Sequence, residues 1–197
     1  MRGIDCTMTN PSVSFIAATT RFTSPRFTLC EERFATPDGE VSRPVIHHPG
    51  AVAVIAQPAP GQLLLVRQYR YPVRRWTLEI PAGTRVPGED PLTTAARELQ
   101  EEAGMRAARL SELVRFFPAI GVSDEELIIY RADGLSEVPS SPEHGELVAR
   151  VVVSLMELSG LVAAGELCDA KTLIAAALLG VDLAGATRRV GAPGGGG

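Results

Sequence analysis

Residues 83–105 read GTRVPGEDPLTTAARELQEEAGM, and the acidic end of this stretch is the centre around which the chain is organised. Glu98, Glu101 and Glu102 fall within five residues, beside Arg97. At spacings of i, i+3 and i+4 they project from adjoining positions on one side of a helix. Such crowding is costly unless a positive charge lies among the carboxylates. The spacing therefore predicts a helix whose edge holds a cation.

The same stretch carries the signals that begin and end a helix. Asp90 supplies a side-chain acceptor at the N-cap, and Pro91 presets φ for the first helical position. Gly104 is a typical C-terminal stop. Between them, apolar residues recur at helical spacing and predict one buried stripe: Leu92, Ala95, Ala96, Leu99 and Ala103.

An arbitrary acidic cluster of this kind is more often a solvated helix face than a ligand set. Two features favour the ligand set here: Gly83, which lets a loop approach the helix closely, and Arg97 among the acids. Oxygen-only ligands suit a hard cation such as Mg²⁺ or Mn²⁺, which shares its remaining positions with waters and substrate phosphates.

Outside this helix the chain alternates predicted strands and helices. We expect strands over 51–56, 62–69, 76–81, 108–117, 126–132 and 147–155, and helices over 156–164 and 170–179. Loops are expected over 118–125 and 134–145. This order predicts an α/β sandwich with a mixed sheet.

The N-terminal part forms a separate region in this interpretation. Pro37-Asp38-Gly39 between two strand-like runs predicts an antiparallel β hairpin over residues 26–46, after a loose first stretch of about 20 residues. We expect a β arm over 1–46, the main domain over 47–183 and a disordered glycine-rich tail over 184–197. The hairpin is either a simple edge hairpin or a dimerisation arm, and the residues alone leave both open.

Composition narrows the possible partners and compartment. The 197 residues are 45% hydrophobic and 21% charged, with a formal net charge of −4 and no basic block, so nucleic acid is not the expected partner. No apolar run is long enough to span a membrane. Cys6, Cys30 and Cys168 are odd in number and widely separated, as expected of reduced thiols in the cytoplasm.

Residues 83–105 resemble the Nudix box, the signature of the Nudix hydrolases. The chain matches all nine fixed positions of that pattern: Gly83, Glu89, Arg97, Glu98, Leu99, Glu101, Glu102, Gly104 and Met105. The resemblance implies an α/β/α sandwich that hydrolyses a nucleoside diphosphate linked to another group. It also implies that Glu98 and Glu102 bind the metal, with Glu101 nearby and the Ala82 carbonyl as a further ligand.

The two remaining polar residues of the box acquire supporting roles by the same resemblance. Arg97 orients the acids by ion pairing, and Glu89 supports them from the loop.

Other stretches look like the subgroup of ADP-ribose pyrophosphatases and nucleoside-diphosphate-sugar hydrolases. They are 51–54, 66–72, 78–83, 121–125 and 165–173. The resemblance implies a homodimer formed through the N-terminal arm.

The resemblance implies that Arg70 contacts the substrate phosphates or the terminal ribose; a surface arginine in a turn is the alternative. Glu79 binds adenine or stabilises the dimer, and Glu125 contacts the terminal sugar.

The catalytic base is expected in the loop before the last strand. Glu146 occupies the position at which the subgroup keeps this base, and Glu143 is the nearby substitute; either is equally interpretable as an ordinary loop acid. Ile120 stands where ADP-ribose hydrolases usually carry proline, and Pro118 lies two residues earlier. The expected reaction is hydrolysis of ADP-ribose to AMP and ribose 5-phosphate. Another nucleotide sugar such as GDP-mannose, or a non-catalytic nucleotide sensor, are the alternatives.

Overall fold

The structure is a computed structural model that describes residues 11–141 and 147–183. The chain divides into two compact units. The first comprises Met1–His48 and Ala119–Glu125, and the second comprises Pro49–Pro118 and Glu126–Gly197.

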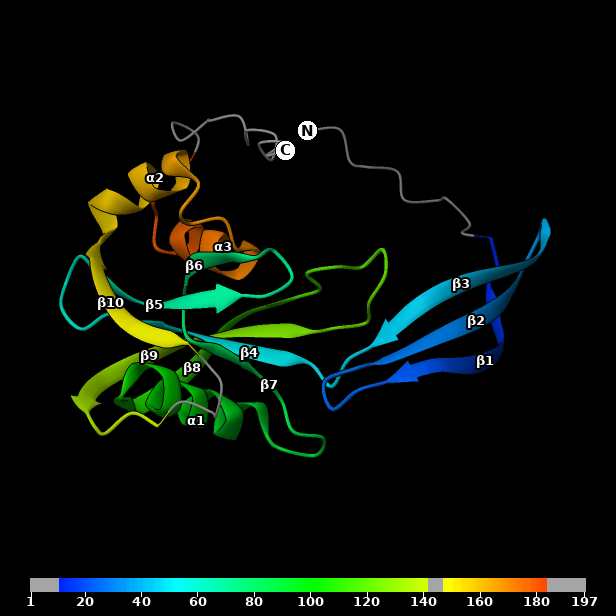
Figure 1. Ribbon diagram of the computed structural model, residues 1–197, viewed down its shortest axis with the longest axis horizontal. Coiled ribbons are helices and arrows are strands. Elements are labelled where there is room, and N and C mark those ends of the chain that lie inside the picture. The colour runs from blue at the N-terminus through cyan, green and yellow to red at the C-terminus, as the bar shows by residue number, and fades with distance from the viewer. Residues whose placement is uncertain (1–10, 142–146, 184–197) are drawn as a thin grey trace, which may run out of the picture. The chain divides into compact units, whose positions relative to one another are not determined.

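The first unit is built on a three-stranded antiparallel sheet in the order β1-β2-β3 (Figure 1). Its strands are β1 (Ser14–Thr23), β2 (Thr28–Thr36) and β3 (Gly39–His47). The predicted hairpin is β2-β3, and Gly39 adopts the positive φ of 116° that a glycine in the turn allows.

The expectation of a loose start is wrong for residues 14–20, which belong to β1. Nine of the ten β1 residues are exposed, so the strand shows no alternation of buried and exposed side chains. Backbone pairing with β2, from Ser14 opposite Ala35 to Thr23 opposite Thr28, holds it instead. That pairing leaves no hydrophobic pattern in the sequence.

The second unit contains two sheets and three helices. One sheet has the order β10-β5-β6 and the other β7-β4-β9-β8. Their bounds are β4 (Ala51–Ala56), β5 (Gln62–Arg70), β6 (Arg75–Glu79), β7 (Ala82–Thr84), β8 (Met105–Phe116), β9 (Leu127–Glu137) and β10 (Val148–Ser154). The helices are α1 (Pro91–Ala103), α2 (Leu155–Ala164) and α3 (Ala170–Leu178).

Strand β4 lies at the centre of the second unit, with all six residues buried. Alternate residues of β4 face two different cores, because successive side chains of a strand point to opposite faces. Val52 and Val54 pack with Leu99 of α1, whereas Ala53 and Ile55 pack with residues of α2 and α3. Figure 1 shows α1 on one side of the sheets and α3 on the other.

This arrangement confirms the predicted α/β/α sandwich, and the parallel β4-β9 pair among antiparallel neighbours makes the second sheet mixed. The largest difference in this part of the sheet is that β9 continues to Glu137, four residues into the predicted loop that began at Gly134. Pairing with β8 extends it, with Leu135 opposite Ala107 and Glu137 opposite Met105. Among the residues that the structure describes, no helix is long and apolar enough to cross a membrane.

Candidate active site

The acidic helix α1 is fixed at both ends by the residues that the sequence indicates. Asp90 is the N-cap, and its side chain accepts a hydrogen bond from the Leu92 N–H at 3.1 Å. Gly104 ends the helix in the left-handed region at φ 62°. The predicted stripe is buried at Ala95, Leu99 and Ala103, but the prediction is wrong for Leu92 and Ala96, which are exposed. Caps and stripe together set which way the glutamates project.

Two of those glutamates converge on the backbone of β7. Glu102 Oε2 accepts a hydrogen bond from the Ala82 N–H at 2.9 Å. A Cβ placed on Gly83 would lie 2.0 Å from both Cδ and Oε1 of Glu98. Any side chain at position 83 would therefore collide with this carboxylate, which explains the glycine. Glu98 and Glu102 are 8% and 6% exposed, so both carboxylates are nearly buried.

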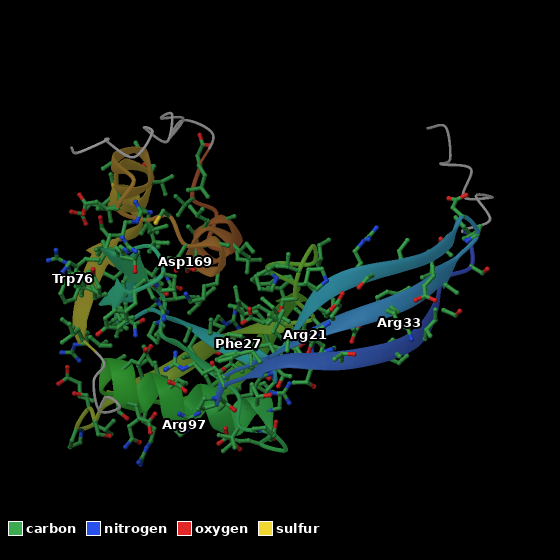
Figure 2. The ribbon with its side chains drawn as sticks, turned by 45° about the vertical axis from the view of Figure 1, so that its right-hand side comes forward. Arg21, Phe27, Arg33, Trp76, Arg97 and Asp169 are labelled. Carbon is green, nitrogen blue, oxygen red and sulfur yellow. The ribbon has the colours of Figure 1, made fainter. Side chains whose placement is uncertain are left out.

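Arg97 supplies positive charge among the acids, as predicted. Its Nη1 lies 2.7 Å from Glu98 Oε1 and 2.9 Å from Glu101 Oε2, and its Nη2 lies 3.6 Å from Glu89 Oε2. Figure 2 labels Arg97 on α1. The Thr94 hydroxyl donates to Glu89 at 2.8 Å, and this bond, with the charge of Arg97, lowers the pKa of Glu89. Arg97 thus ties the loop to the helix.

Arg70 and Glu79 form a two-pronged ion pair between β5 and β6. Arg70 Nε and Nη2 donate to the two oxygens of Glu79 at 2.7 and 2.6 Å, and the Thr77 hydroxyl donates to Glu79 at 2.6 Å. Burial by itself raises the pKa of Glu79, but its bonds to Arg70 and the charge of Lys171 outweigh burial and lower that pKa to about 2. Glu79 is therefore an ionised, buried anchor inside the second unit.

Sequence reasoning missed two members of this network. Lys171 Nζ donates to Glu79 and lies 2.9 Å from Asp169 Oδ2. Asp169 also caps α3, where Figure 2 labels it, by accepting from the Thr172 N–H at 3.1 Å. Both residues lie in the stretch 165–173, whose resemblance to the subgroup is the signal that could have found them.

Of the remaining predicted residues, some lie in the first unit and others lie outside the residues that the structure describes. Glu125 belongs to the first unit, where its Oε1 lies 3.8 Å from His48 Nδ1. Ile120 is 79% exposed in the same unit. Glu143 and Glu146 lie outside the described residues. The structure therefore brings together Ala82, Glu98, Glu101 and Glu102, and the site residues Arg70, Glu79, Glu125 and Glu146 stay predictions.

The donor set near α1 is chemically suited to a hard cation, because every candidate atom is an oxygen. As the side chains lie, Arg97 provides the charge that balances Glu98 and Glu101. Over 11–141 and 147–183, no group of three or more His, Cys, Asp or Glu side chains is arranged to hold a metal ion. A pocket of about 360 Å³ adjoins Glu102 and is also lined by Arg150 and Ser140.

Comparison with known proteins identifies the class. The model of the NUDIX domain family matches residues 47–175. The chain therefore belongs to the NUDIX family, and the fold and the match together define a Nudix hydrolase. This confirms the resemblance carried by residues 83–105. Hydrolases of this family generally need a divalent cation.

Individual relatives narrow the likeness further. The chain is 39% identical to an ADP-ribose pyrophosphatase of Bacillus subtilis, over 75% of this chain and 81% of that protein. It is 38% identical to a methanol dehydrogenase activator of Bacillus methanolicus, over 71% and 77%. It is 41% identical to an ADP-ribose pyrophosphatase of Mycobacterium tuberculosis, over 66% and 64%.

A solved structure supports the fold alone. A crystal structure of an ADP compounds hydrolase superposes with a TM-score of 0.73 at 23% identity, covering 91% of this chain and 97% of that one.

Proposed function

We propose that this chain hydrolyses ADP-ribose to AMP and ribose 5-phosphate with the help of Mg²⁺ or Mn²⁺. The observation that carries the proposal is the convergence of Glu98 and Glu102 on the backbone at Ala82 and Gly83. It is supported by 39% identity to the pyrophosphatase of Bacillus subtilis over 81% of that protein.

The reaction joins a water oxygen to one phosphorus atom and breaks the bond from that atom to the bridging oxygen. When bound, a divalent cation neutralises phosphate charge and lowers the pKa of a coordinated water. Glu98, Glu102 and Glu101, with the Ala82 carbonyl, would hold it. Arg97 offsets the repulsion between Glu98 and Glu101.

The water must also lose a proton. Glu146 is the proposed base that takes it, with Glu143 as the substitute. Arg70 is the proposed contact to the diphosphate, since a guanidinium binds two phosphate oxygens at once. Glu125 is the proposed contact to the terminal sugar.

A second nucleotide sugar is kept as a candidate because of Ile120. This side chain is 79% exposed and occupies the position where proline is usual in ADP-ribose hydrolases. A different residue there favours a different sugar, such as the mannose of GDP-mannose.

The assembly and compartment are part of the same proposal. A homodimer formed through β1-β2-β3 would cover apolar side chains of the first unit, including Phe15 and Phe22, which are 59% and 53% exposed. Cys30 and Cys168 are free thiols, which favours the reducing cytoplasm.

The test is a panel of ADP-ribose, GDP-mannose and dinucleotides, each assayed for phosphate-containing products with Mg²⁺ and with Mn²⁺. ADP-ribose is expected to give the highest kcat/KM. Glu102→Gln should lower kcat on the order of a hundredfold, because one metal-facing charge is lost. Glu166→Gln, the same change at an exposed loop residue, is the matched control and should retain activity.

Two outcomes would contradict the proposal. Full activity in Glu102→Gln would exclude this residue as a metal ligand. Binding without turnover of any compound in the panel would identify a nucleotide sensor.

A further inference from the structure

Lys171 is unusual in the composition of this chain. Of the 19 lysines and arginines, Lys171 alone is a lysine. A chain that otherwise takes arginine at every basic position retains the smaller ammonium here. Lysine carries a compact point charge, whereas arginine presents a wide planar fork. Position 171 therefore holds the one compact ammonium that the side chains of this chain supply.

Two carboxylates surround the Lys171 ammonium. Lys171 is 7% exposed, and its Nζ lies between Glu79 of β6 and Asp169 at the start of α3. Both carboxylates receive a hydrogen bond or ion pair from the same ammonium. A buried charge is tolerated only when it is paired in this way.

The Glu79 carboxylate also binds Arg70. The Glu79 carboxylate is shared, because Lys171 and Arg70 Nη2 both donate to Oε2 and Arg70 Nε donates to Oε1. Arg70 has a side chain that is 34% exposed, so it can meet a ligand, whereas Lys171 cannot. The charge of Glu102 also acts on Arg70, which puts the guanidinium within electrostatic reach of the predicted metal site.

The residue after Lys171 fixes the same segment of backbone. The Thr172 hydroxyl accepts from the Ile80 N–H at 3.0 Å and donates to Asp169 Oδ2 at 2.7 Å. Two residues further along the chain from Ile80, the Ala82 N–H donates to Glu102. The start of α3 thus holds the segment 79–82, which ends at the predicted metal site.

We propose that Lys171 is a positioning residue for substrate binding, acting through Glu79 on Arg70. Lys171 neutralises part of the Glu79 charge, so that Glu79 orients Arg70 while Arg70 keeps positive charge for the diphosphate. Without Lys171, two carboxylates face one guanidinium, and that guanidinium attracts phosphate less. This inference rests on the proposed function, since it assigns Arg70 to the diphosphate.

The test is a double-mutant cycle measured with ADP-ribose. Lys171→Met keeps the length of the side chain and removes its charge. It should raise KM about tenfold and change kcat less than threefold. In an Arg70→Ala background the same change should alter KM less than twofold, because the residue through which Lys171 acts is gone. Arg75→Met, at an exposed basic residue of β6, is the matched control and should leave KM unchanged.

A second measurement does not need Lys171→Met to fold. Protein labelled with lysine that carries ¹³C only at Cε gives one such signal, because Lys171 is the only lysine. Addition of ADP-ribose without metal should shift this signal in the otherwise unchanged chain and leave it in place in Arg70→Ala.

Several results would overturn the inference. An unchanged KM in Lys171→Met would do so, as would an equal rise in both backgrounds, which indicates a structural role alone. A lysine signal whose chemical shift does not change on addition of ADP-ribose would also contradict it. Failure of the unaltered chain to turn over ADP-ribose would instead refute the proposed function, so the two failures are distinguishable.

Discussion

At the scale of single residues, Gly83 is where the backbone of β7 most closely approaches a predicted metal ligand. In Gly83→Ala the new methyl group would lie 2.0 Å from the Glu98 carboxyl, which must move away. Because this carboxyl ends a flexible side chain, we expect a change in unfolding free energy of about 1 kcal/mol or less. Activity should fall by ~100-fold, since a displacement of about 1 Å in a catalytic group can cost that much.

The matched control for Gly83→Ala is Gly160→Ala in α2. A Cβ at Gly160 meets no atom within 4 Å. Alanine there should retain activity and stabilise the helix by roughly 0.5–1 kcal/mol. Measurement of kcat and of urea unfolding on both variants checks the prediction. Equal activity in the two would mean that Glu98 does not need its present position.

The low pKa of Glu79 leads to a second prediction at this scale, on how the free energy of unfolding changes in acid. Its folded pKa of about 2 lies below the ordinary 4.5, so its stabilising contribution is complete above pH 4.5 and is lost as pH falls toward 2. The shift corresponds to at most about 3 kcal/mol. Urea unfolding between pH 7 and pH 3 should show a shallower acid loss for Glu79→Gln than for the unaltered chain.

The control for that series is Glu137→Gln, whose carboxylate is 75% exposed and should leave the acid profile unchanged. Glu79→Gln itself should be less stable at pH 7, because Arg70 and Lys171 lose a shared charged partner. Parallel acid profiles for Glu79→Gln and the unaltered chain would contradict the low pKa of Glu79.

At the scale of elements, His47 links β3 to β2 and to the segment 119–125 within the first unit. Its Nδ1 lies 2.6 Å from Asp124 Oδ2 and its Nε2 lies 2.7 Å from Glu32 Oε1. The hydrogen bonds to Asp124 and Glu32 raise the pKa of His47. Its contribution is therefore complete below pH 6.5 and is lost as pH rises through the folded pKa.

This predicts a pH-dependent attachment of the segment 119–125. The Ile46 N–H donates to the Val122 carbonyl at 2.8 Å, which reports on that attachment. At pH 6 the Ile46 amide should exchange with solvent more slowly in the unaltered chain than in His47→Gln. At pH 9 the two should converge, after correction for intrinsic exchange rates. A difference that persists unchanged at pH 9 would exclude His47 as the titrating group.

At the scale of the whole molecule, the N-terminal arm exposes large apolar side chains. Phe15, Ile16 and Phe22 of β1 are 59%, 42% and 53% exposed. A second copy that covers them would bury apolar area at about 25 cal/mol per Å². We expect a chain that starts at His47 to sediment as a monomer and the full chain as a dimer.

Deletion removes nearly the whole β1-β2-β3 sheet, so substitution of two exposed side chains is the finer test of the dimer. Phe15→Ser combined with Phe22→Ser should weaken dimerisation, whereas Thr19→Ser on the same strand should not. A truncated chain that remains dimeric would place the interface elsewhere.

The helix α1 and its acids were predictable because their signals are local. Asp90, Pro91 and Gly104 act within one turn of the helix ends, and the stripe through Leu99 repeats every three or four residues. Strand β1 was not predictable, because backbone bonds to β2 hold it with its side chains exposed.

The sequence by itself determined the class of chemistry, through the spacing of Glu98, Glu101 and Glu102 on one helix. Only the tertiary structure decided which groups meet around the site. It brings the backbone of Gly83 so close to the Glu98 carboxylate that no Cβ fits between them, and it pairs Glu79 with Lys171, which lies 92 residues away. The physical reason is the distance along the chain over which each signal acts. Periodicity records which face of an element is buried, but a buried ion pair depends on which two elements the fold brings together.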